Sequence, residues 1–273
     1  MGQGALEIVF DYNGKSHCIA FPEATADLPS LFVIGLPKAG STLFNRIMHV
    51  LCQRAGYQVV PWHNVLRKYG IRPRDFPVNI AEVFLPKGYA YIGFRGLVQH
   101  ERLPAFAGGR TVYLVRDPRD MVVSQYFSAA YSHPPPGTKA DASLLRDFEA
   151  TREKLQRTPI DDFVLETAPG FLQMHQLTAS LLSDLDHRMW RYEDIVLEKQ
   201  RWIEEVVGYL DLDVPAGVVR NVVARNDVVP TAESKRQHIR RVTPGDHRDK
   251  LKPETIARLD EIFAPVLTRY GYT

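Results

Sequence analysis

Apolar positions in this chain form short unbroken runs, and between them lie sets of apolar residues repeated at helical spacing. The runs at 31–34 and 111–115 show no alternation, which predicts strands buried on both faces, as in a parallel sheet. Each run is followed by a turn and then by apolar residues with a period near 3.6, which predicts a helix. This alternation is typical of an α/β domain. We predict further strands at 57–60, 89–94 and 187–192, and helices at 43–55, 121–130, 141–157, 170–182, 199–210, 216–226 and 253–270, and leave 161–168 unassigned.

The N-terminal region predicts a β-hairpin. Residues 6–10 and 16–21 are strand-like runs on either side of Asn13-Gly14, a dipeptide favoured in tight hairpin turns. We expect this hairpin at an edge of the main sheet.

The first strand and helix are joined by a glycine loop, GLPKAGST, at residues 35–42. Backbone N–H groups converge at the start of such a helix, where the helix dipole also favours an anion. Gly35 and Gly40 have the spacing of the nucleotide-triphosphate loop G-x-x-x-x-G-K-[ST], but Ser41 stands where that loop has its lysine. The lysine here is Lys38, within the loop itself. We predict an anion cradle, and the alternative is an ordinary strand-to-helix turn with a surface lysine.

A second strand–turn–helix unit carries another basic residue. Arg116 stands directly after the strand at 111–115, at the edge where ligands bind in open α/β sheets. Pro118 suits the first turn of the following helix, and Ser124, two turns into it, can face the same crevice. This arrangement suits a second phosphate. The alternative is that Arg116 pairs with Asp117 or Asp120 in a surface ion network.

Composition narrows the class of protein. The 273 residues suit one large α/β domain or two small ones. A net charge of +2 gives the protein no strong overall electrostatic field. This argues against a nucleic-acid-binding protein, which usually carries a basic surface. Two cysteines without C-x-x-C spacing, Cys18 and Cys52, suit a reducing compartment. With no apolar signal core or membrane-length segment, we expect a cytoplasmic protein without stable membrane insertion. Nothing in the sequence fixes an oligomeric state.

Several stretches together resemble the sulfotransferases that use 3′-phosphoadenosine 5′-phosphosulfate (PAPS). Residues 37–43, PKAGSTL, are similar to the family's PKSGTTW, and residues 116–126, RDPRDMVVSQY, to its RNPKDVAVSYY. Residues 191–194, RYED, resemble its YED, and residues 240–247, RRVTPGDH, match RKGxxGDW loosely.

The resemblance implies an α/β fold of three α/β/α layers, with a central, mostly parallel sheet and a P-loop-like phosphate-binding loop. It implies a single domain over 1–273, in which 65–88 and 131–170 form lid segments at the acceptor site. The implied reaction moves a sulfuryl group from PAPS to a hydroxyl or amine of a small-molecule or lipid-like acceptor, and leaves 3′-phosphoadenosine 5′-phosphate (PAP). No metal-binding pattern is needed or seen.

The resemblance also implies roles for single residues. Lys38 would hold the 5′-phosphosulfate and stabilise charge on the leaving phosphate. Arg116 and Ser124 would bind the 3′-phosphate, and Tyr192 would lie near the adenine. The remaining implied donor contacts come from the loop, at Pro37, Ala39, Gly40, Ser41 and Thr42, and from the late motif, at Arg240 and Arg241, which would close over the 3′-phosphate. The chain departs from the family motifs where Leu43 and His247 replace tryptophans and Val242 replaces a glycine.

A general base is expected to deprotonate the acceptor. The family places a histidine before the Arg/Ser strand, or a glutamate after the first helix. The first place reads GFRG at residues 93–96 and has no histidine, whereas the second contains His63. We predict His63 as the base, because an unperturbed histidine is poised near neutral pH, with His100 and Glu82 as alternatives. Each of the three has the alternative of being an ordinary polar residue.

Two alternatives to a sulfotransferase belong to other classes. A nucleotide or small-molecule kinase needs a lysine after Gly40 and a metal-binding acid, and Ser41 argues against it. A non-catalytic nucleotide-binding protein would keep Lys38 and Arg116 but would tolerate the loss of His63. The acceptor is predicted to enter an apolar mouth, unless its aromatic residues are plain core; the candidates are Trp62, Tyr69, Phe76, Phe84, Tyr131 and the prolines at 134–136.

Overall fold

The computed structural model describes residues 6–12, 14–68, 71, 84–96, 108–135, 142–227, 234 and 240–272. The chain divides into two compact units. The first comprises Met1–Val115 and Met174–Asp227, and the second comprises Arg116–Gln173 and Val228–Thr273. Within the described ranges, no helix combines the length and the hydrophobicity needed to cross a membrane.

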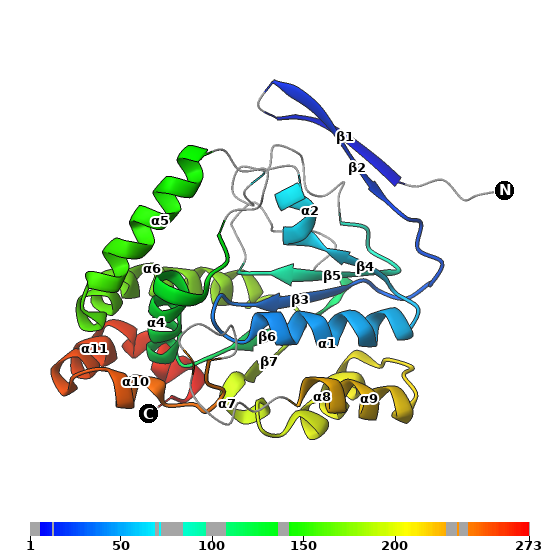
Figure 1. Cartoon of the computed structure of the whole chain (residues 1–273). Helices are drawn as coiled ribbons and strands as arrows, with labels where there is room; N and C mark the ends of the chain where they lie inside the picture. Colours follow the sequence, from blue (N-terminus) through cyan, green and yellow to red (C-terminus); the bar gives the residue numbers. More distant parts are fainter. Residues whose placement is uncertain are drawn as a thin grey trace. The chain divides into compact units, whose positions relative to one another are not determined.

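The first unit is built on a five-stranded sheet in the order β4-β5-β3-β6-β7 (Figure 1). All of its neighbouring strands run parallel. The central strand β3 is buried at every position, as expected for a parallel strand covered on both faces. The strands are β3 (Leu31–Gly35), β4 (Gln58–Pro61), β5 (Tyr89–Phe94), β6 (Arg110–Val115) and β7 (His187–Arg191). Helices flank this sheet, which confirms the predicted α/β class.

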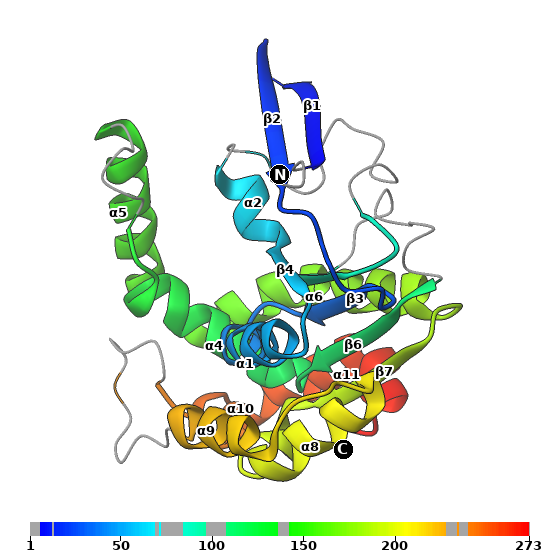
Figure 2. The ribbon, with the colours of Figure 1, turned by 90° about the vertical axis from the view of Figure 1, so that its right-hand side faces the viewer.

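Helices of the first unit position the loop after β3. Helix α1 (Ser41–Arg54) packs against β3, β4 and β5, and ends before Gly56, whose φ is +89°. Its outer side contacts α9 (Ala216–Asn226), which lies beside α8 (Lys199–Leu210) (Figure 2). The short helices α2 (Trp62–Lys68) and α7 (Tyr192–Ile195) follow β4 and β7 directly. Strands β3, β4 and β7 are therefore each followed closely by a helix.

The N-terminal hairpin forms as predicted, with β1 (Leu6–Tyr12) antiparallel to β2 (Lys15–Phe21). Its predicted place at an edge of the main sheet is wrong, because within the described ranges the two strands form a sheet of their own. The chain from 22 to 30 carries no regular strand that would align β2 with β3, and its one bridge joins Pro29 to Lys87. Only Ile19 and Phe21 of β2 are buried.

Strand β5 contains one extra residue where it pairs with β3. Phe32 lies opposite Tyr91, but Ile34 lies opposite Phe94. Gly93 supplies the extra residue with a φ of +89°, a conformation that side chains rarely adopt. Its N–H donates to Oδ1 of Asn45 on α1, at 3.2 Å. The sheet is thus pinned to α1 at the point where the bulge redirects the end of β5.

The second unit is helical. It contains α4 (Pro118–Phe127), which continues into the π-helix η4 (Ser128–Ser132), and α5 (Ala142–Arg157). It also contains α10 (Asp246–Lys250), α11 (Pro253–Tyr270) and the first part of α6 (Ile160–Leu182). Its buried core comprises Val122, Val123, Tyr126, Phe127, Val164, Ala168, Leu251, Leu259, Phe263 and Leu267.

Helix α6 begins ten residues before its predicted start at position 170. The sequence Pro169-Gly170 reads as a break, because proline removes a helical hydrogen bond. Val164 and Ala168 are nevertheless fully buried at helical spacing, and Asp161 and Asp162 occupy the first turn, where acidic residues complement the helix dipole. Tertiary packing therefore outweighs the local signal.

The core of the second unit gives a first prediction. Phe263→Ala removes a side chain with no exposed surface, so it should lower the free energy of unfolding by about 3–5 kcal/mol. Leu144→Ala, at a side chain 52% exposed on α5, should change it by less than about 0.5 kcal/mol. Urea unfolding of both variants checks this. An equal loss in the two would contradict the assigned core.

Candidate active site

The loop after β3 is held in a tight, partly strained conformation. Lys38 and Gly40 have φ values of 67° and 81°. A Cβ added to Gly35 would lie 2.8 Å from Cβ of Ser41, and one added to Gly40 would lie 2.7 Å from the ring of Tyr192. Both positions therefore require glycine. A lysine in the left-handed region costs about 1–2 kcal/mol, and such strain clusters at functional sites.

Helix α1 starts directly from this loop. Gly40 is its N-cap residue, and among the described residues no side chain caps the helix. Its first turn contains no acidic residue. The orphan N–H groups of the first turn, together with the helix dipole, form an anion-binding geometry. The predicted strand–loop–helix geometry is therefore present in the first unit, and anion binding by the loop and the start of α1 stays a prediction.

Arg95 adds a cation to the same region. It is the first residue after β5, and its Nη1 donates to Oγ of Ser41, the first residue of α1. The sequence draws attention to this position only because the histidine of the resembled family is missing there. Its closeness to α1 depends on the pairing of β5 with β3, which the local sequence does not reveal.

His63, the predicted base, lies in the first turn of α2. Its ring centroid is 6.0 Å from that of Phe94. Its Nε2 is buried and has no hydrogen-bond partner among the described residues. Burial, and secondly the charge of Arg95, lowers the pKa of His63 to about 4. His63 is therefore neutral near pH 7 and able to accept a proton. The reason for choosing it, an unperturbed pKa near neutrality, does not hold, because a pKa of about 4 makes it a weaker base. The alternatives His100 and Glu82 lie outside the described residues, as do Tyr69 and Phe76.

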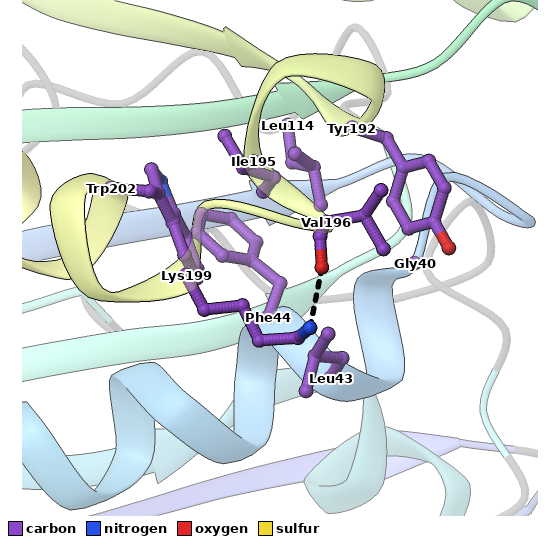
Figure 3. Close-up of a pocket in the computed structure, with 9 residues that line it drawn as sticks. All are labelled: Gly40, Leu43, Phe44, Leu114, Tyr192, Ile195, Val196, Lys199 and Trp202. Atoms are coloured by element: carbon purple, nitrogen blue, oxygen red, sulfur yellow. Dashed lines mark hydrogen bonds between the residues drawn. The ribbon is translucent and has the colours of Figure 1, made fainter. Parts of the chain in front are cut away.

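The ring of Tyr192 covers Gly40 at the mouth of a small pocket (Figure 3). The pocket spans about 230 Å³, part of it open to solvent. Inside, Lys199 donates to the carbonyl of Val196, and its Nζ lies 2.8 Å from Oδ1 of Asp227. The lining residues are Gly40, Leu43, Phe44, Leu114, Tyr192, Ile195, Val196, Lys199 and Trp202. A small, mostly apolar hollow thus adjoins the loop.

In the second unit, the carboxylate of Asp120 joins the start of α4 to the start of α10. Asp120 is fully buried. It accepts from Nη2 of Arg116 at 3.3 Å and from N–H of Gly245 at 2.9 Å. His247 donates its backbone N–H at 3.0 Å, and its Nδ1 lies 2.7 Å away. Burial would raise the pKa of Asp120, but hydrogen bonds from His247 and the charge of Arg116 hold it well below its ordinary value.

The alternative reading of Arg116 is thus half right. Arg116 does pair with Asp120, but both are buried, with 6% and 0% of their surface exposed. A buried arginine whose partner is also held by other donors has a fixed direction. Ser124, the other residue predicted for the 3′-phosphate, lies on α4 and is partly buried.

The two arginines of the late motif are held by a second buried carboxylate. Arg240 and Arg241 both donate to Asp246, which is 1% exposed, and Arg241 also donates to Asp249. The guanidinium of Arg240 lies 4.1 Å from the ring centroid of Phe127, a cation–π contact. Carboxylates and an aromatic face therefore order a segment whose composition alone suggests a solvated loop.

Comparison with known proteins identifies the family. Residues 108–271 match the family model of the sulfotransferase domain, which is more than half of the 273 residues. The chain therefore belongs to the sulfotransferase family, and the predicted class of enzyme is confirmed. No curated protein sequence matches the chain.

Two solved structures share the fold. Mouse sulfotransferase SULT7A1, crystallised with PAP, superposes with a TM-score of 0.55 at 14% identity, over 95% of this chain and 94% of that one. Retinol dehydratase, in complex with androsterone and the inactive cofactor PAP, gives 0.51 at 15% identity, over 87% of this chain and 80% of that one. At these identities, the likeness establishes the fold alone.

We expect Asp120→Asn to destabilise the protein by about 3 kcal/mol or more at pH 7, because it leaves Arg116 buried without its counter-charge. The matched change Asp249→Asn removes a carboxylate whose side chain is 56% exposed, and should cost about 1 kcal/mol or less. Urea unfolding measures both.

The effect of Asp120→Asn should depend on pH. Because the folded-state pKa of Asp120 is depressed, its contribution is present above the ordinary carboxyl pKa of about 4 and is lost as the pH falls below that value. The gap between wild type and Asp120→Asn should therefore narrow on acidification. A gap that stays constant down to pH 3 would contradict the buried ion pair.

Proposed function

We propose that this sulfotransferase moves a sulfuryl group from PAPS to a hydroxyl, or an amine, of a small-molecule or lipid-like acceptor and releases PAP. The observation that carries the proposal is the start of α1, which no described side chain caps, together with the loop before it, in which Lys38 is held in the left-handed region. The two solved structures described above were crystallised with PAP, and one also contains androsterone. These ligands support a nucleotide donor and a small acceptor.

The loop and α1 are proposed to bind the 5′ end of the donor. Backbone amides at the start of α1 suit a dianionic phosphate, and Lys38 supplies a positive charge. The loop contacts would come from Pro37, Ala39, Gly40, Ser41 and Thr42. Tyr192 and Leu43 line the hollow beside the loop, and the adenine is proposed to lie against Tyr192, as the family resemblance implies.

The arginines of the second unit are proposed to bind the 3′-phosphate, with Ser124 as a hydroxyl donor. Arg116 is paired with Asp120, and a guanidinium, with five N–H donors, can bind a carboxylate and a phosphate at the same time. Arg240 and Arg241 are similarly held by Asp246. Arginines already fixed in direction lose little side-chain entropy when an anion binds.

The transfer itself is proposed to run in line. His63 takes the proton of the acceptor, whose oxygen or nitrogen forms a bond to sulfur. The bond between sulfur and the bridging oxygen of the 5′-phosphate breaks, and that oxygen keeps the electron pair. Lys38 stabilises the charge that develops there, in the way that fixed cations act in phosphoryl transfer. No net oxidation or reduction occurs.

We further propose that residues 1–273 act as one sulfotransferase domain, which the 95% coverage by one related fold supports. The lid segments are proposed at 65–88 and 131–170. A cytoplasmic location is proposed from the sequence alone. A kinase remains the alternative enzyme, but Ser41 after Gly40 disfavours it.

Thermal unfolding with PAP, compared with ATP and magnesium, tests the donor. PAP at about 100 times its dissociation constant should add roughly 2.7 kcal/mol to the free energy of unfolding. Lys38→Ala and Arg116→Ala should each lose most of this gain, whereas Arg46→Ala, at an exposed arginine of α1, should keep it. Stabilisation by ATP and magnesium alone would favour the kinase.

The base is tested by the pH dependence of transfer, using an acceptor found by screening phenols and alcohols. Because the pKa of His63 is lowered to about 4, kcat/KM should stay level as the pH falls from 8 to 5 and drop only near 4. His63→Gln should reduce kcat by about 10²–10⁴-fold. An acid limb near 6.5, or a His63→Gln variant with full activity, would rule out this role.

A further inference from the structure

Arg95 is placed between the two reacting ends by the order of the sheet. His63 follows β4, Arg95 follows β5, and the loop with Lys38 follows β3. These strands are neighbours in the order β4-β5-β3 and run parallel. Their carboxyl ends therefore meet at one edge of the sheet, with Arg95 between the proposed base and the phosphate cradle.

Two further observations fix the direction of Arg95. The bulge at Gly93 puts Phe94 in register with Ile34, and Arg95 is the residue directly after the end of β5. The N–H of Gly93 is held by Asn45 of α1. The guanidinium then reaches Oγ of Ser41, the first residue of α1. Arg95 itself is exposed, so its remaining donors are accessible to a ligand.

We propose that Arg95 binds the oxygens of the sulfuryl group during its transfer, a role that rests on the proposed function. In an in-line displacement, the moving group lies between the acceptor, at the base, and the leaving oxygen, at the cradle. The sheet order gives Arg95 that middle position. A guanidinium there meets the sulfuryl oxygens, whereas Lys38 meets the leaving phosphate.

With an arginine at this position, charge stabilisation and proton acceptance fall to two different residues. Arginine stays protonated in proteins, so Arg95 cannot act as the base. Burial first, and the charge of Arg95 second, lower the pKa of His63. His63 is therefore neutral before the reaction, although the same charge also disfavours the imidazolium that forms when it accepts a proton. Arg95 therefore stabilises the charge of the sulfuryl group, and His63 accepts the proton of the acceptor.

A purely structural role is the competing explanation. In that case Arg95 would hold Ser41 and the start of α1, and its loss would weaken every ligand of the cradle alike. The two roles differ in their effect on PAP, which carries the 5′-phosphate but no sulfuryl group. Binding of PAP and of PAPS by the same variants therefore separates them without any knowledge of the acceptor.

The experiment measures dissociation constants for PAP and PAPS by titration calorimetry on the full chain. Arg95→Met should leave the Kd of PAP within about 2-fold of wild type and weaken PAPS by about 10-fold, the loss of one charge-assisted contact. Arg95→Lys should recover part of the PAPS affinity. Arg46→Met, which removes an exposed arginine from α1, should leave both constants unchanged.

Transfer to an acceptor found by screening gives a second readout. Arg95→Met should lower kcat by about 10²–10³-fold, as for the loss of one group that stabilises transition-state charge. Equal weakening of PAP and PAPS would overturn the proposal in favour of a structural role, and unchanged binding and kcat would also overturn it. A wild-type protein that binds neither ligand would instead overturn the proposed function itself.

Discussion

The first turn of α1 begins with N–H groups that no described side chain caps, and much of the first unit is arranged around them. A side chain at Gly35 would strike Ser41, and one at Gly40 would strike Tyr192. The buried strand β3 delivers the chain to this turn, and α1 itself packs on three strands of the sheet. Rigid, close-packed surroundings keep the amide dipoles oriented before any ligand arrives, which is the condition for strong electrostatic stabilisation.

In the second unit, the main structural requirement is to hold several arginines in place. Repulsion among Arg116, Arg240 and Arg241 is offset by buried carboxylates. Asp120 and Asp246 each accept from more than one donor. Asp120 also binds the backbone at Gly245 and His247. The same carboxylate therefore orients an arginine and fixes the path of the loop that carries the next two.

His247 shows how the chain accommodates its departure from the family motif. The resemblance leads one to expect a tryptophan at this position, which would contribute apolar packing. The histidine is deeply buried, with 2% of its surface exposed, and it contributes a polar contact to Asp120. Polarity here is satisfied within the second unit rather than by solvent.

Much of the fold could be read from the sequence. Unbroken apolar runs located β3 and β6, and helical periodicity located α8, α9 and α11 with the bounds that the structure has. The early start of α6 was missed, because Pro169-Gly170 looks like a break and the burial that overrides it depends on residues distant in the chain. The hairpin was predicted correctly, but its position at the edge of the main sheet was not, because pairing between distant strands is not encoded locally.

The candidate site could be predicted only in part. Motifs located Lys38, Arg116 and Tyr192, and the structure adds the contacts around them. Asp120 was considered only as a surface partner, because a carboxylate in the run RDPRD gives no sign that it will be buried. At Arg95, the sequence showed only that the histidine of the family is missing. Its position depends on which strand lies beside β3, and this information belongs to the tertiary structure.

The bulge in β5 means that chain length, as much as residue identity, determines what Arg95 can do. Successive residues of a strand point to opposite faces of a sheet, so one extra residue exchanges the faces for everything after it. Deleting Gly93 would leave every chemical group of the site in the sequence. It would nevertheless turn Arg95 away from Ser41, and it would turn Phe94 toward the opposite layer. A single-residue change in length, without any change in chemistry, is enough at this point to connect or disconnect a cation from the start of α1.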